Sequence, residues 1–144
     1  MSDIIKISLA NTAFNLSAAE EIFSALARAA TPDIQKQYHI RTVLSEIYGN
    51  AYLYSNRTRP NSSIDIEACF TPDRFTASII NEGRGPADIN NRKMETISPY
   101  AESGRGLAIV RKLCDNVYFK KMSESKFGVF IEIELPVAKK ITST

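Results

Sequence analysis

Two pairs of apolar, strand-like runs, each joined by a short polar turn, restrict the fold of this chain most strongly. Residues 64–70 and 75–80 flank the turn TPDR, and residues 116–122 and 127–135 flank the turn SESK. Turns this short join antiparallel strands, because a parallel pair needs a crossover of a dozen or more residues. The chain is therefore expected to contain two antiparallel hairpins, with helical segments between them.

The N-terminal part of the chain shows one further strand and one helix. Apolar and polar residues alternate over residues 4–9, which predicts a strand. Apolar residues then recur at helical spacing up to Ala30, and Ser17 followed three residues later by Glu20 has the pattern of a capping box. We therefore expect a helix that begins at Ser17 and ends near Ala30.

Two more helices are expected, one in the middle of the chain and one before the second hairpin. The first starts near Thr31, with Pro32 at the first helical position, and its apolar stripe continues to about Tyr54. The second covers residues 107–113. Hairpins with helices between them predict an α+β fold, a two-layer α/β sandwich in which helices cover one face of a mixed, mainly antiparallel sheet.

Composition limits the classes of protein that this sequence fits. The 144 residues carry 18 Lys and Arg against 16 Asp and Glu, and the net charge of +2 gives no electrostatic footprint for direct nucleic-acid binding. No apolar run approaches the roughly 20 residues of a membrane-spanning helix, and no secretory signal pattern is found. With two cysteines and no disulfide framework, the expectation is a single cytoplasmic domain over residues 1–144.

A long irregular segment interrupts the regular pattern between residues 81 and 106. It holds four of the six glycines and two of the six prolines, with little periodicity. Loops of this length inside a compact domain are uncommon, and they are usually functional or mobile. The sequence therefore points to this segment, and to the elements that flank it, for function.

The helix predicted from Thr31 to about Tyr54 carries a carboxylate and an amide, Glu46 and Asn50, in the sequence LSEIYGNAY. Residues four apart lie one turn above the other on the same helix face. A carboxylate serves as a general base, and an amide oxygen ligates hard cations. Gly49 costs about 1 kcal/mol in a helix relative to alanine, which favours the close approach of another group. On spacing alone, a solvated glutamate and a surface asparagine remain the simpler interpretation.

Glycine pairs stand at both ends of the irregular segment. Residues 81–85 (NEGRG) follow a strand directly, where glycine permits close backbone approach to a ligand or simply a tight turn. Residues 104–107 (GRGL) open the short helix, where unpaired N–H groups and the arginine fit an anion, or where a flexible helix start needs no ligand. Neither pair completes a dinucleotide fingerprint, and the sequence contains no P-loop pattern.

The order of these three sequences along the chain resembles the N, G1 and G2 boxes of the GHKL ATPases, the superfamily of gyrase and the histidine kinases. A helix with Glu-x-x-x-Asn comes first, then a strand that ends in a Gly-x-Gly sequence, then a long loop, then Gly-x-Gly-Leu at a helix start. The small size and the strand-helix lead-in are similar to one branch, the bacterial anti-sigma-factor serine kinases. The resemblance runs from about residue 4 to residue 136.

The resemblance implies a nucleotide site and a role for each residue in it. Glu46 would be the catalytic base, and Asn50 would ligate a Mg²⁺ ion that bridges the ATP phosphates. The residues between the two glycine pairs would form a lid over the nucleotide. The ATP-binding residues that the resemblance implies are Asn50, Asn81, Gly83, Gly85, Gly104, Arg105, Gly106 and Leu107. Phosphoryl transfer needs positioning and charge neutralisation more than covalent help, so such a set suffices chemically.

The resemblance also implies partners. Members of this branch phosphorylate a serine of a small STAS-domain anti-anti-sigma protein, bind a sigma factor and keep it from RNA polymerase, often as homodimers. The implied function of this chain is therefore a serine/threonine protein kinase that is also an anti-sigma factor, with Mg²⁺ as cofactor and ATP as substrate. A stand-alone ATPase is a weaker interpretation, because nothing in the sequence supplies a coupled output domain.

Three positions depart from the family pattern. The G1 box normally begins with an aspartate that binds the adenine amino group, and Asn81 stands there instead. The last strand offers Val129 and Phe130 where the family tends to carry a threonine, and Tyr54 replaces a histidine four residues after Asn50. A charge-assisted hydrogen bond lost from a buried pocket costs about 1.5–3 kcal/mol. The alternative function is therefore a nucleotide-free regulator that acts by protein contact alone.

Overall fold

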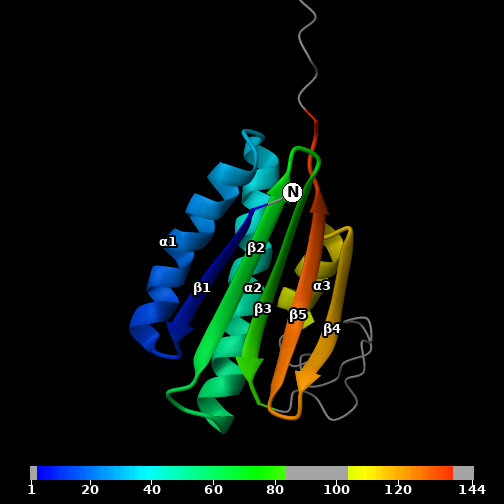
Figure 1. The fold of residues 1–144 in the computed structure, drawn as a ribbon. Helices are drawn as coiled ribbons and strands as arrows, with labels where there is room; N and C mark the ends of the chain where they lie inside the picture. The colour runs from blue at the N-terminus through cyan, green and yellow to red at the C-terminus, as the bar shows by residue number, and fades with distance from the viewer. Residues whose placement is uncertain (1–2, 84–103, 138–144) are drawn as a thin grey trace, which may run out of the picture.

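The computed structural model describes residues 3–83 and 104–137, and the side chains at 56–58 and 104–107 lie outside this description. The described residues form five strands and three helices (Figure 1). In chain order, the elements are β1 (Ile4–Ala10), α1 (Ala13–Ala30), α2 (Ile34–Thr58), β2 (Ser63–Thr71), β3 (Arg74–Glu82), α3 (Gly104–Leu113), β4 (Asn116–Ser123) and β5 (Lys126–Glu134). Both predicted hairpins, β2–β3 and β4–β5, are present.

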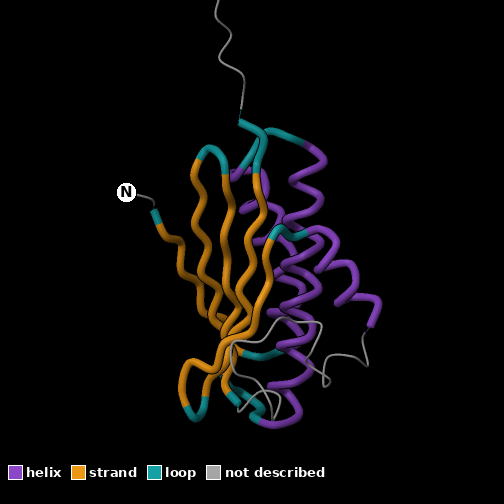
Figure 2. The backbone as a smooth tube through the Cα atoms, turned by 90° about the vertical axis from the view of Figure 1, so that its right-hand side faces the viewer, coloured by secondary structure: helices purple, strands orange, loops and turns teal. Residues whose placement is uncertain are grey.

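The five strands form one sheet in the order β1-β2-β3-β5-β4. The three helices lie against the same face of this sheet, and the opposite face has no described helix over it (Figure 2). The predicted α+β sandwich is therefore confirmed. The sequence predicts a mixed sheet, whereas all four pairings among the described residues are antiparallel. Because two antiparallel helices separate β1 from β2, the chain returns to the sheet in the reverse direction.

Helix α1 begins earlier than the sequence predicts. The hydroxyl of Thr12 accepts a hydrogen bond of 3.2 Å from the backbone N–H of Asn15, and this caps the helix. The Asn15 side chain also donates to the carbonyl of Ala10, so the end of β1 and the start of α1 are held together. Ser17 therefore lies inside α1, and the prediction of a cap there is wrong.

Helix α2 begins and ends later than predicted. Its N-cap is Asp33, whose carboxylate accepts a 2.8 Å hydrogen bond from the backbone N–H of Lys36, and Pro32 stands before this cap. The helix continues past Tyr54 to Thr58. α2 is therefore a 25-residue helix that lies along the full length of the sheet (Figure 1). No described helix, this one included, is both long and apolar enough to cross a membrane.

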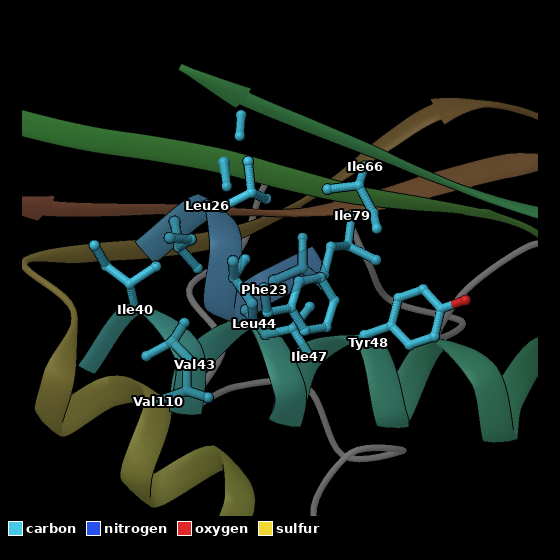
Figure 3. Close-up of a cluster of buried hydrophobic side chains, with 14 of the residues drawn as sticks. Phe23, Leu26, Ile40, Val43, Leu44, Ile47, Tyr48, Ile66, Ile79 and Val110 are labelled. Atoms are coloured by element: carbon cyan, nitrogen blue, oxygen red, sulfur yellow. The ribbon is translucent and has the colours of Figure 1, made fainter. Parts of the chain in front are cut away.

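The hydrophobic core lies between the sheet and the helices (Figure 3). On α2, Leu44 and Ile47 are buried, and the ring of Tyr48 meets the ring of Phe23 on α1 edge-on, with 5.6 Å between centroids. Val110 of α3 is also fully buried. Burial of each such side chain stabilises the fold by roughly 1.5–3 kcal/mol, so α2 is fixed between α1, α3 and the sheet.

Alternation along the strands divides the sheet into a covered face, toward the helices, and an uncovered face. On β3, Phe75, Ala77, Ile79 and Asn81 are buried on the covered face. The residues between them point to the uncovered face, because successive strand residues point to opposite sides. Asn81 is the one buried polar residue of this strand, and it stands near the end of β3.

Candidate active site

Helix α2 presents Glu46 and Asn50 one turn apart, as the sequence predicts. Their neighbours Ile47 and Ala51 are buried in the core, whereas Glu46 and Asn50 are half-buried at its edge. A Cβ atom placed on Gly49 would meet no heavy atom within 4 Å. The close approach that this glycine favours is therefore made by no described part of the chain.

Asn81 lies on the covered face and is 1% exposed. Its Nδ2 donates a 3.1 Å hydrogen bond to the backbone carbonyl of Glu82. The amide nitrogen is thereby turned toward the backbone, and Oδ1 is left to serve as an acceptor. Burial and orientation both fit a side chain that recognises a single donor group.

The ring of Tyr54 connects α2 to the strand position of Asn81. Tyr54 follows Asn50 by one helical turn, and its ring packs edge-on against Phe127 of β5, with 5.5 Å between centroids. Phe127 is the β5 residue opposite Asn81 in the antiparallel register. The face of α2 that carries Asn50 therefore lies beside the end of β3, so the structure brings the first two motifs together. The sequence shows Tyr54 only as a departure from the family, since its packing depends on β5.

Gly83 follows β3 in a conformation that other residues rarely adopt, with φ of 132°. Its backbone N–H donates a 2.7 Å hydrogen bond to the carbonyl of Ser125, in the turn between β4 and β5. The sequence alone gives no sign of this contact, because it depends on where the second hairpin lies in the sheet. Gly85, predicted to line the same pocket, lies outside the described residues.

The third motif forms the first turn of α3, which begins at Gly104 rather than at Leu107. α3 packs beside α2, and its Val110 lies near Val43 of that helix (Figure 3). A helix start presents unpaired backbone N–H groups and the positive end of the helix dipole, both of which suit a phosphate. α3 therefore adjoins the helix that carries Glu46, while the side chains of residues 104–107 lie outside the description.

Val129 and Phe130, which occupy the region of the family threonine, point to opposite faces of the sheet. Val129 lies on the covered face and is 3% exposed. Phe130 lies on the uncovered face, where its ring is 5.2 Å from the ring of Tyr118. Of these two residues, only Val129 shares a face with Asn81. Its aliphatic side chain offers no hydrogen bond to a nucleotide.

The available oxygen donors fit Mg²⁺ bound together with a nucleotide. Glu46 and Asn50 provide a carboxylate and an amide oxygen, both of the hard type that Mg²⁺ prefers. The described residues contain no group of three His, Cys, Asp or Glu side chains that would hold a metal by itself. Mg²⁺ needs no such cage, since it commonly binds through one or two side chains, water and substrate phosphates.

Two raised pKa values belong to the core rather than to this region. Burial raises the pKa of Tyr48 to about 12, with a smaller contribution from the nearby Tyr52. Burial also raises the pKa of Cys114 to about 12, with a smaller contribution from Asp115. Tyr48 is fully buried, and Cys114 packs against the core. These shifts therefore reflect packing, and they assign no catalytic role.

The chain belongs to the histidine kinase-like ATPase domain family, which it matches over residues 9–129. The matched region runs from β1 into β5 and includes all of the predicted site residues. The resemblance to the GHKL ATPases is therefore confirmed.

Three named relatives are similar over nearly the whole chain. The anti-sigma F factor of Halalkalibacterium halodurans is 28% identical over 146 residues, which cover 98% of this chain and 99% of the relative. That of Oceanobacillus iheyensis is 24% identical over 144 residues, with 98% and 99% covered. That of Shouchella clausii is 28% identical over 144 residues, with 96% and 94% covered. All three carry the name of the anti-sigma branch that the sequence resembles.

Proposed function

We propose that this chain is an anti-sigma regulatory factor with serine/threonine protein kinase activity. Its three relatives are named anti-sigma F factors, and their similarity over nearly the whole chain supports a sigma factor as one partner. The other partner is a STAS-domain anti-anti-sigma protein, whose serine receives the γ-phosphoryl group of ATP. The chain acts in the cytoplasm as a single domain over residues 1–144, and it forms a homodimer.

The observation that carries the kinase proposal is the position of the Asn50 face of α2 beside Asn81. The ring contact between Tyr54 and Phe127 packs this face at the end of β3. Asn81 is the buried polar residue of an otherwise apolar strand face. Because a buried amide is costly unless its hydrogen-bonding groups are used, its position supports a polar ligand between α2 and β3.

In the proposed reaction, the serine hydroxyl of the STAS-domain protein attacks the γ-phosphorus of ATP, and ADP leaves. Glu46 accepts the proton of that hydroxyl. Asn50 would hold Mg²⁺ through its amide oxygen, and a bound ion would supply charge neutralisation at the phosphates. The backbone N–H groups at the start of α3 bind the phosphates, with Arg105 adding positive charge. Positioning and neutralisation of this kind account for most of the catalysis in phosphoryl transfer.

Asn81 recognises the base in this proposal. Since its Nδ2 donates to the carbonyl of Glu82, Oδ1 is the atom that accepts from the adenine amino group. Gly83 and Gly85 line the adenine and ribose pocket, where the absence of side chains lets the backbone approach the ligand. A neutral amide is a weaker acceptor than the family aspartate, by about 1–1.5 kcal/mol.

One observation favours the alternative of a nucleotide-free regulator. Val129 fills the covered face where the family tends to carry a threonine, and it is almost completely buried. Together with the neutral Asn81, this leaves fewer hydrogen-bonding side chains to recognise adenine. Such a regulator binds its partners by protein contact alone, and it has no use for Glu46 and Asn50 as base and metal ligand.

Transfer of labelled γ-phosphate to a STAS-domain protein of the same source tests the proposal. We expect transfer to serine by the wild-type chain, and Glu46→Gln lowers the rate by about 10²–10⁴-fold while ATP binding persists. Glu21→Gln, an exposed carboxylate change on α1, is the matched control and leaves the rate unchanged. Unchanged transfer by Glu46→Gln would remove Glu46 as the base, and no transfer by the wild type would favour the nucleotide-free regulator.

A further inference from the structure

A buried hydrogen bond joins α2 to the end of β1. Nδ2 of Asn11 donates to Oγ of Ser55 over 2.7 Å, and these residues are 2% and 0% exposed. Ser55 follows Tyr54 directly and lies little more than one helical turn after Asn50. The bond therefore holds the part of α2 that carries the proposed Mg²⁺ ligand.

Asn11 is itself fixed to the sheet. Its backbone N–H donates a 2.8 Å hydrogen bond to the carbonyl of Ser62, which continues the register of β1 and β2 by one residue. The preceding carbonyl, of Ala10, accepts from the backbone N–H of Thr12 and from the side chain of Asn15. Because the backbone on both sides of Asn11 is held, its amide group is a fixed donor toward α2.

Two contacts hold this end of α2, and they come from opposite sides of β3. The hydrogen bond reaches α2 from Asn11 at the end of β1, whereas the ring contact joins Tyr54 to Phe127 of β5. In the sheet order, β3 lies between β1 and β5. Successive helix residues point about 100° apart, so contacts made by two neighbours in two directions fix the rotation of the helix about its axis. That rotation sets the direction of Asn50 relative to Asn81 on β3.

The hydrogen bond is present although the other half of the amide is unsatisfied. Oδ1 of Asn11 is buried, and it has no hydrogen-bond partner in the part of the chain that the structure describes. A buried acceptor without a partner is costly, whereas apolar groups in place of both members of a hydrogen-bonded pair are often nearly neutral for stability. Stability alone therefore gives little reason for asparagine at this position, and a directional bond to α2 gives a better one.

We propose that Asn11 is a positioning residue for the nucleotide site, because its bond to Ser55 sets the rotation of α2. That rotation aims Asn50 and Glu46 at the phosphates of ATP. Asn11 acts only through the helix, since its amide group is buried and bonded to Ser55. The inference rests on the proposed function and adds to it a residue that lies outside the three sequence motifs.

The two halves of the proposed site are expected to respond differently to loss of this bond. Asn81 stands on β3, which is paired with β2 on one side and β5 on the other, so the adenine half is held without α2. Asn50 and Glu46 stand on α2 itself. Without the bond, we expect ATP binding in the absence of Mg²⁺ to persist and the gain in affinity from Mg²⁺ to disappear. A misplacement of about 1 Å costs up to about 10²-fold in rate, so kcat is expected to fall about 10–100-fold.

The double variant Asn11→Leu/Ser55→Ala tests the inference in the full chain. It removes both members of the pair together, so thermal unfolding is expected to stay close to that of the wild type. Calorimetric titration with ATP, with and without Mg²⁺, measures the two halves of the site. Transfer of labelled γ-phosphate to the STAS-domain protein measures kcat. The matched control is Asn15→Leu, the same substitution at an asparagine that joins α1 to the end of β1, and it is expected to leave kcat and the Mg²⁺ gain unchanged.

Ser55→Ala alone is the second variant, because it breaks the same bond by the loss of one oxygen atom. It is expected to lower kcat to the same extent as the double variant. Folded variants that keep both the wild-type kcat and the Mg²⁺ gain would overturn the inference and leave the kinase proposal standing. An equal loss of ATP affinity with and without Mg²⁺ would also overturn it, because a general disturbance of the fold would then explain the effect. A wild-type chain that neither binds ATP with Mg²⁺ nor transfers phosphate would overturn the kinase proposal and this inference together.

Discussion

The same strands form both faces of the sheet, yet their side chains are buried on one face and partly exposed on the other. On β4, Phe119 is fully buried beneath the helical layer, while its neighbour Tyr118 is partly exposed on the other side. On β5, Val129 and Phe130 divide in the same way. The covered face is closed by three helices, whereas the uncovered face keeps large apolar groups with no described element over them (Figure 2).

Each face departs in one place from the pattern of its other residues. On the covered face a polar side chain, Asn81, stands among apolar ones, and burial of an amide is costly unless it is bonded. On the uncovered face the partly exposed side chains of Tyr118 and Met122 stand among polar residues, and exposed apolar patches commonly mark interfaces. The proposed nucleotide site therefore lies on the covered face, and the exposed apolar side chains lie on the opposite face.

The largest expected effect is a difference in stability between substitutions at two neighbouring residues of β4, one on each face of the sheet. Phe119→Ala removes a fully buried ring, and it is expected to lower the free energy of unfolding by about 3–5 kcal/mol. Tyr118→Ala changes the uncovered face, and in the monomer it is expected to cost under about 1 kcal/mol, because its ring is already partly in water. Urea denaturation at low protein concentration measures both. Equal losses would show that the two faces contribute alike to folding.

A second substitution tests Asn81, the buried polar residue on the covered face. Asn81→Asp restores the family carboxylate, so ATP affinity is expected to rise by up to about tenfold, or about 1–1.5 kcal/mol. The same change replaces an N–H donor by a carboxylate facing the carbonyl of Glu82, so the chain without ligand loses about 1–3 kcal/mol of stability. Calorimetric titration and thermal unfolding measure the two effects. An unchanged ATP affinity would show that the side chain at position 81 does not bind adenine.

The third prediction concerns stability at alkaline pH. The pKa of Cys114 is raised from 9.0 to about 12 in the folded chain, so between these values the unfolded chain loses a proton that the folded chain keeps. The free energy of unfolding therefore falls by about 1 kcal/mol per pH unit between about pH 9 and 10. Above about pH 10 the buried Tyr48, whose pKa is raised from 10.0 to about 12, adds a slope of the same sign. Cys114→Val is expected to remove the slope between about pH 9 and 10. A slope that survives in this interval in Cys114→Val would assign the titration to other groups.

The smallest expected effect lies at the start of the helical layer. Thr12→Ala removes the hydroxyl that caps α1, and it is expected to cost about 1 kcal/mol. Ser17→Ala, inside the same helix, is expected to be neutral or slightly stabilising, because alanine has the higher helix propensity. Thermal unfolding compares the two variants. A larger loss of stability in Ser17→Ala than in Thr12→Ala would show that Ser17 caps the helix.

The sequence predicts the hairpins and the helices well, but it misplaces helix starts. Short turns fix antiparallel pairing locally, so β2–β3 and β4–β5 follow from the chain itself. The capping-box pattern at Ser17 and Glu20 is equally compatible with a helix interior, and Thr12 takes the cap because Asn15 ties it to β1. Both hydrogen bonds are local, spanning three and five residues, so the error at Ser17 lies in the choice between two nearby cap positions.

The sequence predicts which helix or strand carries each site residue, but it does not predict how these elements come together. The spacing of Glu46 and Asn50 predicts a shared helix face, and the structure has them on α2 as expected. The approach of that face to Asn81 depends on the contact between Tyr54 and Phe127, which are far apart in the chain. Nor does the run Val129-Phe130-Ile131 reveal an uncovered face, since three consecutive apolar residues hide the alternation.

The most direct test of the nucleotide site is calorimetric titration of the wild-type chain and the Asn50→Ala chain with ATP, each with and without Mg²⁺. The account predicts micromolar binding to the wild type that depends on Mg²⁺, and a loss of that dependence in Asn50→Ala. Absence of ATP binding to the folded wild-type chain would contradict the kinase and leave a regulator that acts by protein contact alone.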